Sequence, residues 1–261
     1  MSQDLLLTAP DSALVDALHP SPNIEPRRSG YRPDLLLLHY TGMQDVDKAI
    51  DWLSRPESSV SCHYVIAEDG RITQMVAEDL RAWHAGHSYW AGATDINSCS
   101  IGIEIHNRGH ADGYPDFPKA QMEAVARLSA DIIERHRIAK DRVLAHSDVA
   151  PWRKIDPGEK FNWRGLADAG VGRWIMPEPV DSGWSMGLGS RSEKIADGQH
   201  LLRRYGYGIE VTGMLDEATA FVLRAFQMHW RQERVDSRLD HSTLVTLRRL
   251  VSETESGRAV G

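Results

Sequence analysis

The sequence has 261 residues, of which 41% are hydrophobic and 26% charged, and its formal net charge is −7. The length suits one large domain or a medium and a small one, and no apolar run reaches the ~20 residues that a membrane-spanning helix needs. The acidic excess lies before residue 191 and argues against nucleic acid as the main partner, and two cysteines, Cys62 and Cys99, are too few for a disulfide framework.

The first predicted elements lead from a proline-rich segment into a buried strand. Residues 8–34 contain five prolines and indicate an extended, irregular segment that lies over the domain. The apolar run Leu35-Leu36-Leu37-Leu38 is typical of a strand buried on both faces. His39 ends this strand and is a candidate metal ligand, although a histidine standing alone is more often a satisfied core residue. Apolar residues at 46, 49, 50 and 53 predict a helix over Val46–Leu53.

A hairpin and an aromatic loop follow. Residues 63–66 and 72–75 flank Asp69-Gly70, a pair that favours the tight turn of a β-hairpin. The loop Trp83–Trp90 is rich in Trp, Tyr and His. We interpret this loop as a ligand-contacting segment, with capping of the core as the alternative.

The next predicted strand carries a carboxylate. Residues 101–105 are apolar or glycine except at Glu104, and a carboxylate in a buried strand is costly unless it is paired or lies near a metal. A strand-end residue facing water is the alternative. An apolar stripe predicts a helix over Lys119–His136 that covers the sheet. The short apolar strand at 142–145 then leads to His146.

The loop from Leu144 to Gly158 concentrates reactive side chains. It holds His146, Lys154 and Asp156, and its two prolines prevent a continuous helix. A neutral imidazole and a carboxylate are zinc ligands, and a nearby lysine can stabilise a developing oxyanion. A polar loop with a surface ion pair is the alternative.

The order of these elements predicts an α/β fold. We expect residues 1–178 to form a central mixed β-sheet flanked by helices, in which the polar residues at the strand ends gather at one rim. Residues 179–190 are rich in Gly and Ser and indicate a linker.

Residues 191–261 contain an internal repeat, because Leu215–Thr219 matches Leu239–Thr243. Asp216 and Asp240 are good N-caps, and a further helix precedes them. We therefore expect a small all-α three-helix bundle that folds as a separate unit and serves as a binding module.

The motifs in the first 165 residues resemble a known family. They are similar to those of the zinc-dependent type-2 N-acetylmuramoyl-L-alanine amidases, the AmpD and AmiD group, which are related to peptidoglycan recognition proteins. In chain order the motifs are Leu38-His39-Tyr40-Thr41, Ser61-Cys62-His63-Tyr64-Val65-Ile66, Trp83-His84-Ala85-Gly86, Ser100-Ile101-Gly102-Ile103-Glu104-Ile105 and the stretch from His146 to Gly158. The repeat in the last seventy residues, with Thr212–Asp216 and Ala225–Gln227, resembles the three-helix peptidoglycan-binding domain often attached to such amidases.

This resemblance implies a role for each candidate residue. His39, His146 and Asp156 would hold one zinc ion per chain, and Glu104 and Lys154 would be the catalytic pair. The enzyme would hydrolyse the amide bond between the lactyl group of N-acetylmuramic acid and L-alanine, in peptidoglycan or in (anhydro)muropeptides. The candidate substrate-binding residues are Trp83, His84, His63 and Arg71.

Two other functions fit the same residues. A protein of this fold that lost the metal would bind muropeptides without cleaving them, and a zinc peptidase would cut within the stem peptide instead. We expect a monomer with no nucleic-acid partner and no membrane span. The start, Met1-Ser2-Gln3-Asp4, carries no basic segment of a secretory signal, so we expect a cytoplasmic protein, with the periplasm or envelope as the alternative.

Overall fold

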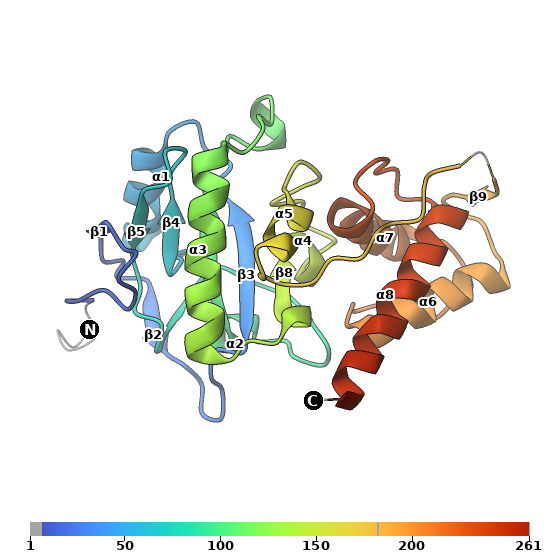
Figure 1. The fold of residues 1–261 in the computed structure, drawn as a ribbon, viewed down its shortest axis with the longest axis horizontal. Coiled ribbons are helices and arrows are strands. Elements are labelled where there is room, and N and C mark those ends of the chain that lie inside the picture. The colour runs from blue at the N-terminus through green and yellow to red at the C-terminus, as the bar shows by residue number, and fades with distance from the viewer. Residues whose placement is uncertain (1–6, 182, 261) are drawn as a thin grey trace.

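A computed structural model describes residues 7–181 and 183–260 and arranges them as a sheet domain beside a helical unit (Figure 1). The first six residues, on which the expectation about a secretory signal rests, lie outside the described residues. Within the described ranges, no helix has the length and apolarity needed to cross a membrane.

The sheet is mixed, as predicted, and has six strands. Its strand order is β1-β5-β4-β7-β3-β8. The long strands β3 (Leu35–Tyr40) and β7 (Ser100–Ile105) pair in parallel, and β8 (Val143–Ala145) is parallel to β3 on its other side. The strand β4 (Tyr64–Ile66) is parallel to β7 and forms the predicted hairpin with the antiparallel β5 (Ile72–Gln74).

The proline-rich segment contributes more structure than expected. It supplies the edge strand β1 (Ala17–Leu18), which is parallel to β5, and β2 (Ile24–Pro26), which pairs with β6 (Leu80–Ala82) in a separate two-stranded ribbon. Pro26 is tolerated there because it ends a short strand in a two-stranded ribbon, where its missing N–H interrupts no central ladder. The prediction of an irregular segment was therefore wrong at these two short stretches.

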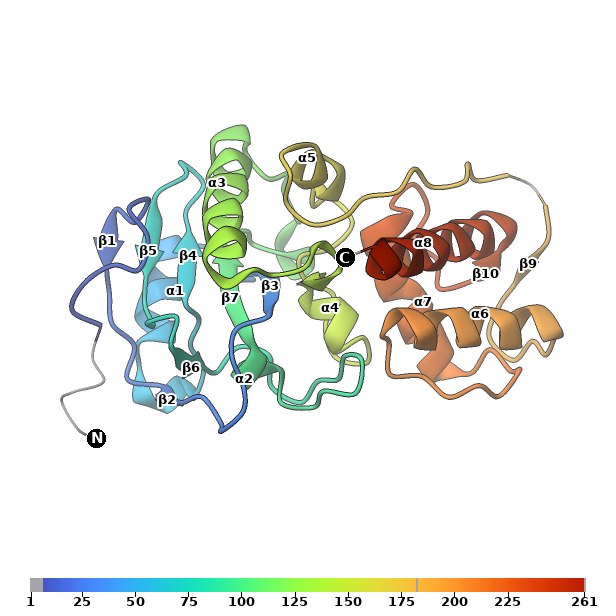
Figure 2. The same cartoon turned by 60° about the horizontal axis from the view of Figure 1, so that its bottom comes forward.

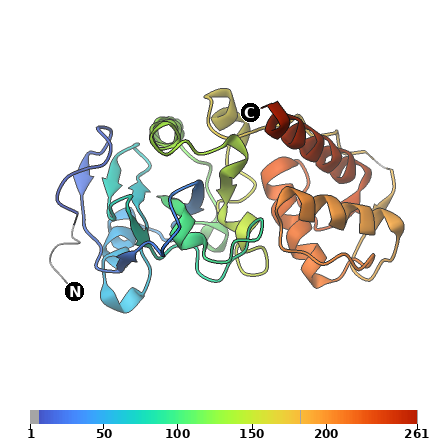
Figure 3. The same ribbon diagram turned by 90° about the horizontal axis from the view of Figure 1, so that it is seen from below.

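Helices cover both faces of the sheet. On one face α3 (Lys119–His136) runs alongside the strands (Figure 1), and α1 (Val46–Leu53) packs on the opposite face (Figures 2 and 3). Both helices have the predicted bounds. Ala124, Val125 and Leu128 of α3 share a core with Leu36 and Leu38.

The alternation of side chains along β3 and β7 places the candidate site residues His39 and Glu104 on the face opposite α3. Because successive side chains of a strand point to opposite faces, His39 lies on the same face as Leu35 and Leu37, which are absent from the α3 core. Glu104 is the register partner of His39, and its neighbours Ile103 and Ile105 face α3. The same face therefore carries both polar side chains.

Shorter elements complete the sheet domain. They are α2 (Ile96–Cys99), α4 (His146–Val149), α5 (Trp163–Asp168) and the 3₁₀ turns Pro56–Ser58, His110–Asp112 and Lys140–Arg142. His146 is the first residue of α4 and follows β8 directly, so the end of a strand places it as expected.

The helical unit consists of α6 (Glu193–Tyr205), α7 (Glu217–Trp230) and α8 (His241–Val260). The predicted caps are present, because the Asp216 carboxylate accepts the N–H of Thr219 and that of Asp240 accepts the N–H of Thr243. The segment predicted as a linker includes β9 (Ser185–Met186), which pairs with β10 (Leu239–Asp240).

The two units share one apolar core. Leu35, Leu37 and Trp90 of the sheet domain belong to the same buried cluster as Leu202 and Phe226 of the helical unit. Rings add to this contact: Trp163 of α5 stacks on His229 of α7 with centroids 3.7 Å apart. We still expect the helical unit to fold separately, but in the whole chain it is packed firmly against its neighbour.

Candidate active site

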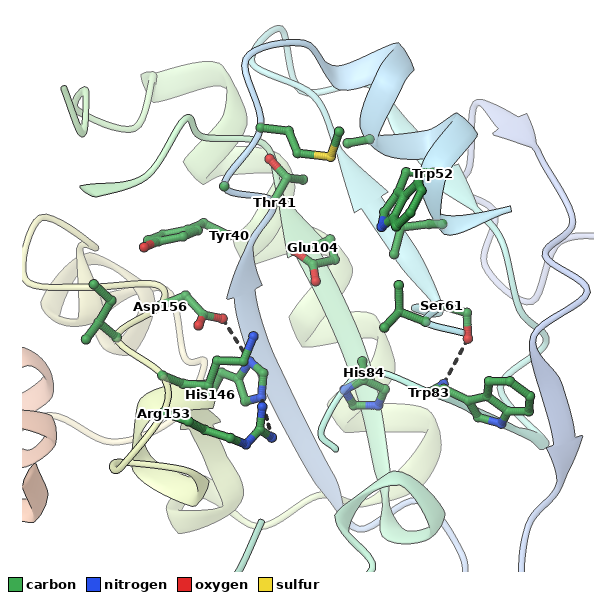
Figure 4. A pocket seen from close by; sticks show the side chains of 17 residues that line it. Tyr40, Thr41, Trp52, Ser61, Trp83, His84, Glu104, His146, Arg153 and Asp156 are labelled. Carbon is green, nitrogen blue, oxygen red and sulfur yellow. Dashed lines mark hydrogen bonds and ion pairs between the residues drawn. The ribbon is translucent and has the colours of Figure 1, made fainter. Parts of the chain in front are cut away.

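A cavity of about 430 Å³ lies on the face opposite α3 (Figure 4). Its walls come from the end of β3, from α1, from the aromatic loop after β6 and from the loop after α4. The lining residues are Tyr40, Thr41, Gly42, Met43, Ala49, Trp52, Leu53, Val60, Ser61, Trp83, His84, Glu104, His146, Arg153, Lys154, Ile155 and Asp156.

Three buried side chains converge beside this cavity. His39 Nδ1 lies 2.8 Å from His146 Nδ1 and 3.3 Å from Asp156 Oδ2, and His146 Nδ1 lies 3.0 Å from Asp156 Oδ2. Ligand bonds of about 2.0–2.1 Å around a tetrahedral zinc ion imply ligand–ligand separations of about 3.3 Å. The triangle is therefore close to the size that a tetrahedral ion requires, and these residues form a candidate metal site.

The protonation of the cluster suits a cation. Burial, together with His146, lowers the pKa of His39 to about 4, so its imidazole is neutral at pH 7. Burial by itself would raise the pKa of Asp156, but His146 and His39 outweigh it and hold that pKa well below the usual range. Neutral imidazoles and an ionised carboxylate are the forms that bind metal.

Glu104 and Lys154 both line the cavity. Glu104 Oε2 is buried and accepts no hydrogen bond from the described residues. Burial and the nearby Asp156 raise the pKa of Glu104 well above its usual value, whereas Lys154 lowers it. A buried carboxyl group in a cavity whose pKa is strongly shifted is a candidate general acid or base.

The four candidate substrate-binding residues separate into two pairs. Trp83 and His84 line the cavity, and the Trp83 N–H donates to Ser61 Oγ at 2.8 Å (Figure 4). The structure does not bring His63 or Arg71 to it. His63 is fully buried, with one ring nitrogen 3.0 Å from the N–H of Gly102 and the other 3.2 Å from the Leu80 carbonyl.

Arg71 is exposed at the β4–β5 hairpin, where it faces Asp47 at 3.5 Å. His63 stands in one of the motifs that resemble the family and Arg71 lies outside them, and in neither case does the sequence position show where the side chain points. We therefore keep only Trp83 and His84 as residues of the cavity wall.

Sequence reasoning missed Trp52 and Arg153. Trp52 lies on α1, lines the cavity and is 44% exposed. An aromatic residue outside the apolar stripe of a predicted helix was the signal that could have identified it. Arg153 donates from Nε to the His87 carbonyl at 2.9 Å and so connects the loop after α4 to the aromatic loop.

Comparisons with known proteins agree with this site. Residues 29–159 match the family described as N-acetylmuramoyl-L-alanine amidase, and residues 191–247 match a family of peptidoglycan binding domains. The N-acetylmuramoyl-L-alanine amidase AmiD of Escherichia coli strain K12 is 37% identical in an alignment 224 positions long, which covers 81% of this chain and 80% of AmiD. The chain therefore belongs to the N-acetylmuramoyl-L-alanine amidase family, and the predicted class of enzyme is confirmed.

Solved structures extend the likeness over both units. A complex of AmiD from E. coli with anhydro-N-acetylmuramic acid-L-Ala-D-gamma-Glu-L-Lys has a TM-score of 0.73 and 35% identity, and the match covers 87% of this chain and 91% of the chain in that structure. A complex of AmpDh3 from Pseudomonas aeruginosa with anhydromuramic pentapeptide has a TM-score of 0.69 and 33% identity, and it covers 85% of this chain and 92% of AmpDh3.

Proposed function

We propose that this amidase uses one zinc ion, held by His39, His146 and Asp156, to cleave the bond between the lactyl group of N-acetylmuramic acid and L-alanine. The observation that carries the proposal is the triangle of ligand atoms, 2.8–3.3 Å apart, beside a cavity that also contains an unpartnered carboxylate oxygen. Zinc held there supplies Lewis acidity, which polarises an amide carbonyl and makes water more acidic.

The chain's own residues supply proton transfer and charge. We assign Glu104 to accept the proton of the attacking water and to return it to the leaving amine. The pKa of Glu104 is raised by burial, and a bound cation would lower it toward the ionised form that a base requires. Lys154 carries the positive charge that stabilises the oxyanion formed from the amide carbonyl.

Muropeptides with a 1,6-anhydro sugar are the proposed substrates. Support comes from the two relatives whose structures hold anhydromuramic peptides. Trp52 and Trp83 in the cavity wall offer aromatic faces on which a sugar ring packs well. The helical unit, which matches peptidoglycan binding domains, is proposed to hold intact cell wall as well.

Mass spectrometry of the products tests this function. The expected products from an anhydromuropeptide are the free anhydro sugar and the intact stem peptide. A shortened muropeptide would instead indicate a peptidase, and an unchanged muropeptide bound by the protein would indicate a binding protein. A chelator should abolish the reaction, and added zinc should restore it.

Three expectations stay predictions. Cell fractionation would check the cytoplasmic location, and analytical ultracentrifugation would check the monomeric state. Pelleting of the inactive Glu104→Gln protein with peptidoglycan would check wall binding by the whole chain. A protein that stays in the supernatant would contradict the role proposed for the helical unit.

A further inference from the structure

We propose that two consecutive residues of the aromatic loop, His84 and Ala85, fix the tautomer and orientation of both metal-binding histidines. His84 acts through its ring on His39, and Ala85 acts through its carbonyl on His146. The inference rests on the proposed function, because it concerns the zinc ligands. It makes His84 a positioning residue rather than a contact for the substrate.

The hydrogen bonds that lead to His39 can run in one direction only. Ser100 Oγ lies 2.6 Å from the Ile96 carbonyl, which only accepts, so the hydroxyl donates there. Because its only hydrogen is donated to Ile96, Ser100 Oγ must accept from the Nε2–H of His84, which lies 3.2 Å away. A neutral imidazole with a proton on Nε2 has a free lone pair on Nδ1.

That lone pair determines the state of His39. His84 Nδ1 lies 3.0 Å from His39 Nε2, so His39 must carry its proton on Nε2 and donate it. His39 Nδ1 is then unprotonated, and this is the atom in the triangle of ligand atoms. These hydrogen bonds thus leave the Nδ1 lone pair of His39 free to bind a metal.

Ala85 does the same for His146 by a shorter route. His146 Nε2 lies 3.3 Å from the Ala85 carbonyl, an acceptor, and 3.4 Å from Arg153 Nη2, a donor. The carbonyl is the nearer partner, and we assign the proton of this ring to Nε2, from which it donates to that carbonyl. Nδ1 of His146 is again the free atom and faces the triangle. The Arg153 guanidinium also donates to the Ala85 carbonyl and helps to hold it in place.

The surrounding structure is shaped to hold this pair of residues. The buried Asn97 accepts the N–H of His84 at 3.0 Å and that of Ala85 at 2.7 Å through one oxygen, Oδ1. Gly102 of β7 provides the room for the ring, because a Cβ at this position would lie 2.5 Å from His84 Nδ1. A glycine inside a strand often marks such a close approach.

The same contacts argue against a direct role of His84 in substrate binding. Both ring nitrogens are already engaged, one by His39 and one by Ser100, and the residue is only 9% exposed. Only the edge of the ring is left for the cavity. Residues that hydrogen-bond to metal-binding histidines, without touching the metal, set the basicity and orientation of those rings. Their loss typically lowers metal affinity 10–100-fold.

The test compares zinc affinity in whole-chain variants by competition with a chelator. His84→Phe keeps a ring but removes the acceptor, and we expect zinc to bind 10–100-fold more weakly. His84→Asn places an amide oxygen near the position of Nδ1 and should recover part of the affinity. Ser100→Ala, a smaller change, removes the acceptor of the His84 proton and should also weaken zinc binding.

His87→Phe is the matched control, since His87 is an exposed histidine of the same loop whose ring packs on Trp152. It should bind zinc with wild-type affinity. Wild-type affinity in both His84→Phe and Ser100→Ala would overturn the inference, as would lower melting temperatures with unchanged zinc affinity. A wild-type protein that binds no zinc would overturn the proposed function itself, so the two failures are distinguishable.

Discussion

Besides the shared apolar core, the contact between the two units contains a buried carboxylate, that of Asp148, which accepts hydrogen bonds from both units. Asp148 of α4 lies two residues after His146 and is fully buried. Its Oδ1 accepts from the Tyr207 hydroxyl at 2.5 Å, and its Oδ2 accepts from the Ala145 N–H at 2.8 Å and from His229 Nδ1 at 2.7 Å. Two of the three donors come from the helical unit.

Tyr207→Phe removes one of these donors and little else. The ring of Tyr207 packs against Trp90 with centroids 4.9 Å apart, and phenylalanine retains that contact. The loss is therefore one hydrogen bond to a buried carboxylate, for which a cost of about 2 kcal/mol in the free energy of unfolding is typical. For a chain of this size, that cost corresponds to a decrease of about 4–8 °C in melting temperature.

Calorimetry of the metal-free protein measures the effect, because bound zinc would raise the melting temperature by itself. Tyr89→Phe is the control: Tyr89 is partly exposed, and its hydroxyl makes no hydrogen bond to the described part of the chain. The control should melt at the wild-type temperature. A Tyr207→Phe protein that also melts within about 1 °C of wild type would refute this account of the interface.

Four other side chains give expected outcomes of their own. Glu104→Gln should keep its zinc but lose roughly 10²–10⁴-fold in single-turnover rate, and normal turnover would contradict its role as the base. His146→Ala should lose zinc, so full metal content in that variant would defeat the ligand assignment. Trp83→Ala should lower kcat/KM toward anhydromuropeptides, and an unchanged value would remove Trp83 from the substrate site. Burial would raise the pKa of Glu78, but hydrogen bonds from Arg135, His136 and Tyr64 lower it to about 2. Because this folded-state pKa lies below the unfolded value of 4.5, about 3 kcal/mol of stability at neutral pH should be lost as the pH falls from about 4.5 toward 2, and Glu78→Gln should remove that dependence in acid unfolding curves.

Periodic patterns made much of the fold predictable. The apolar stripes placed α1 and α3 at their observed bounds, since a helix that covers a sheet must bury one face. The run of four leucines predicted the central strand, because a strand covered on both faces is apolar at successive positions. Strand ends and a short loop indicated that polar side chains would gather at one rim, and the family resemblance selected His39, His146 and Asp156 among them, which the structure brings together.

Side-chain partners that are distant in sequence were not predictable. His63 stands in a motif similar to one of the family, yet its ring nitrogens are hydrogen-bonded to the backbone of Gly102 and Leu80. The function of Asn97 depends on two N–H groups more than ten residues earlier in the chain. No local pattern encodes such contacts, because they arise only when the strands and loops have packed.

The shared core between the sheet domain and the helical unit changes how such an enzyme would work on a surface. A module on a free tether lets a catalytic site search every bond within reach of the tether. Here Leu37 and Phe226 belong to one buried cluster, so the cavity stands at a fixed offset from the helical unit. An enzyme anchored to cell wall through α6–α8 would therefore cut at a set distance from its point of attachment, and it would have to release the wall before reaching the next bond.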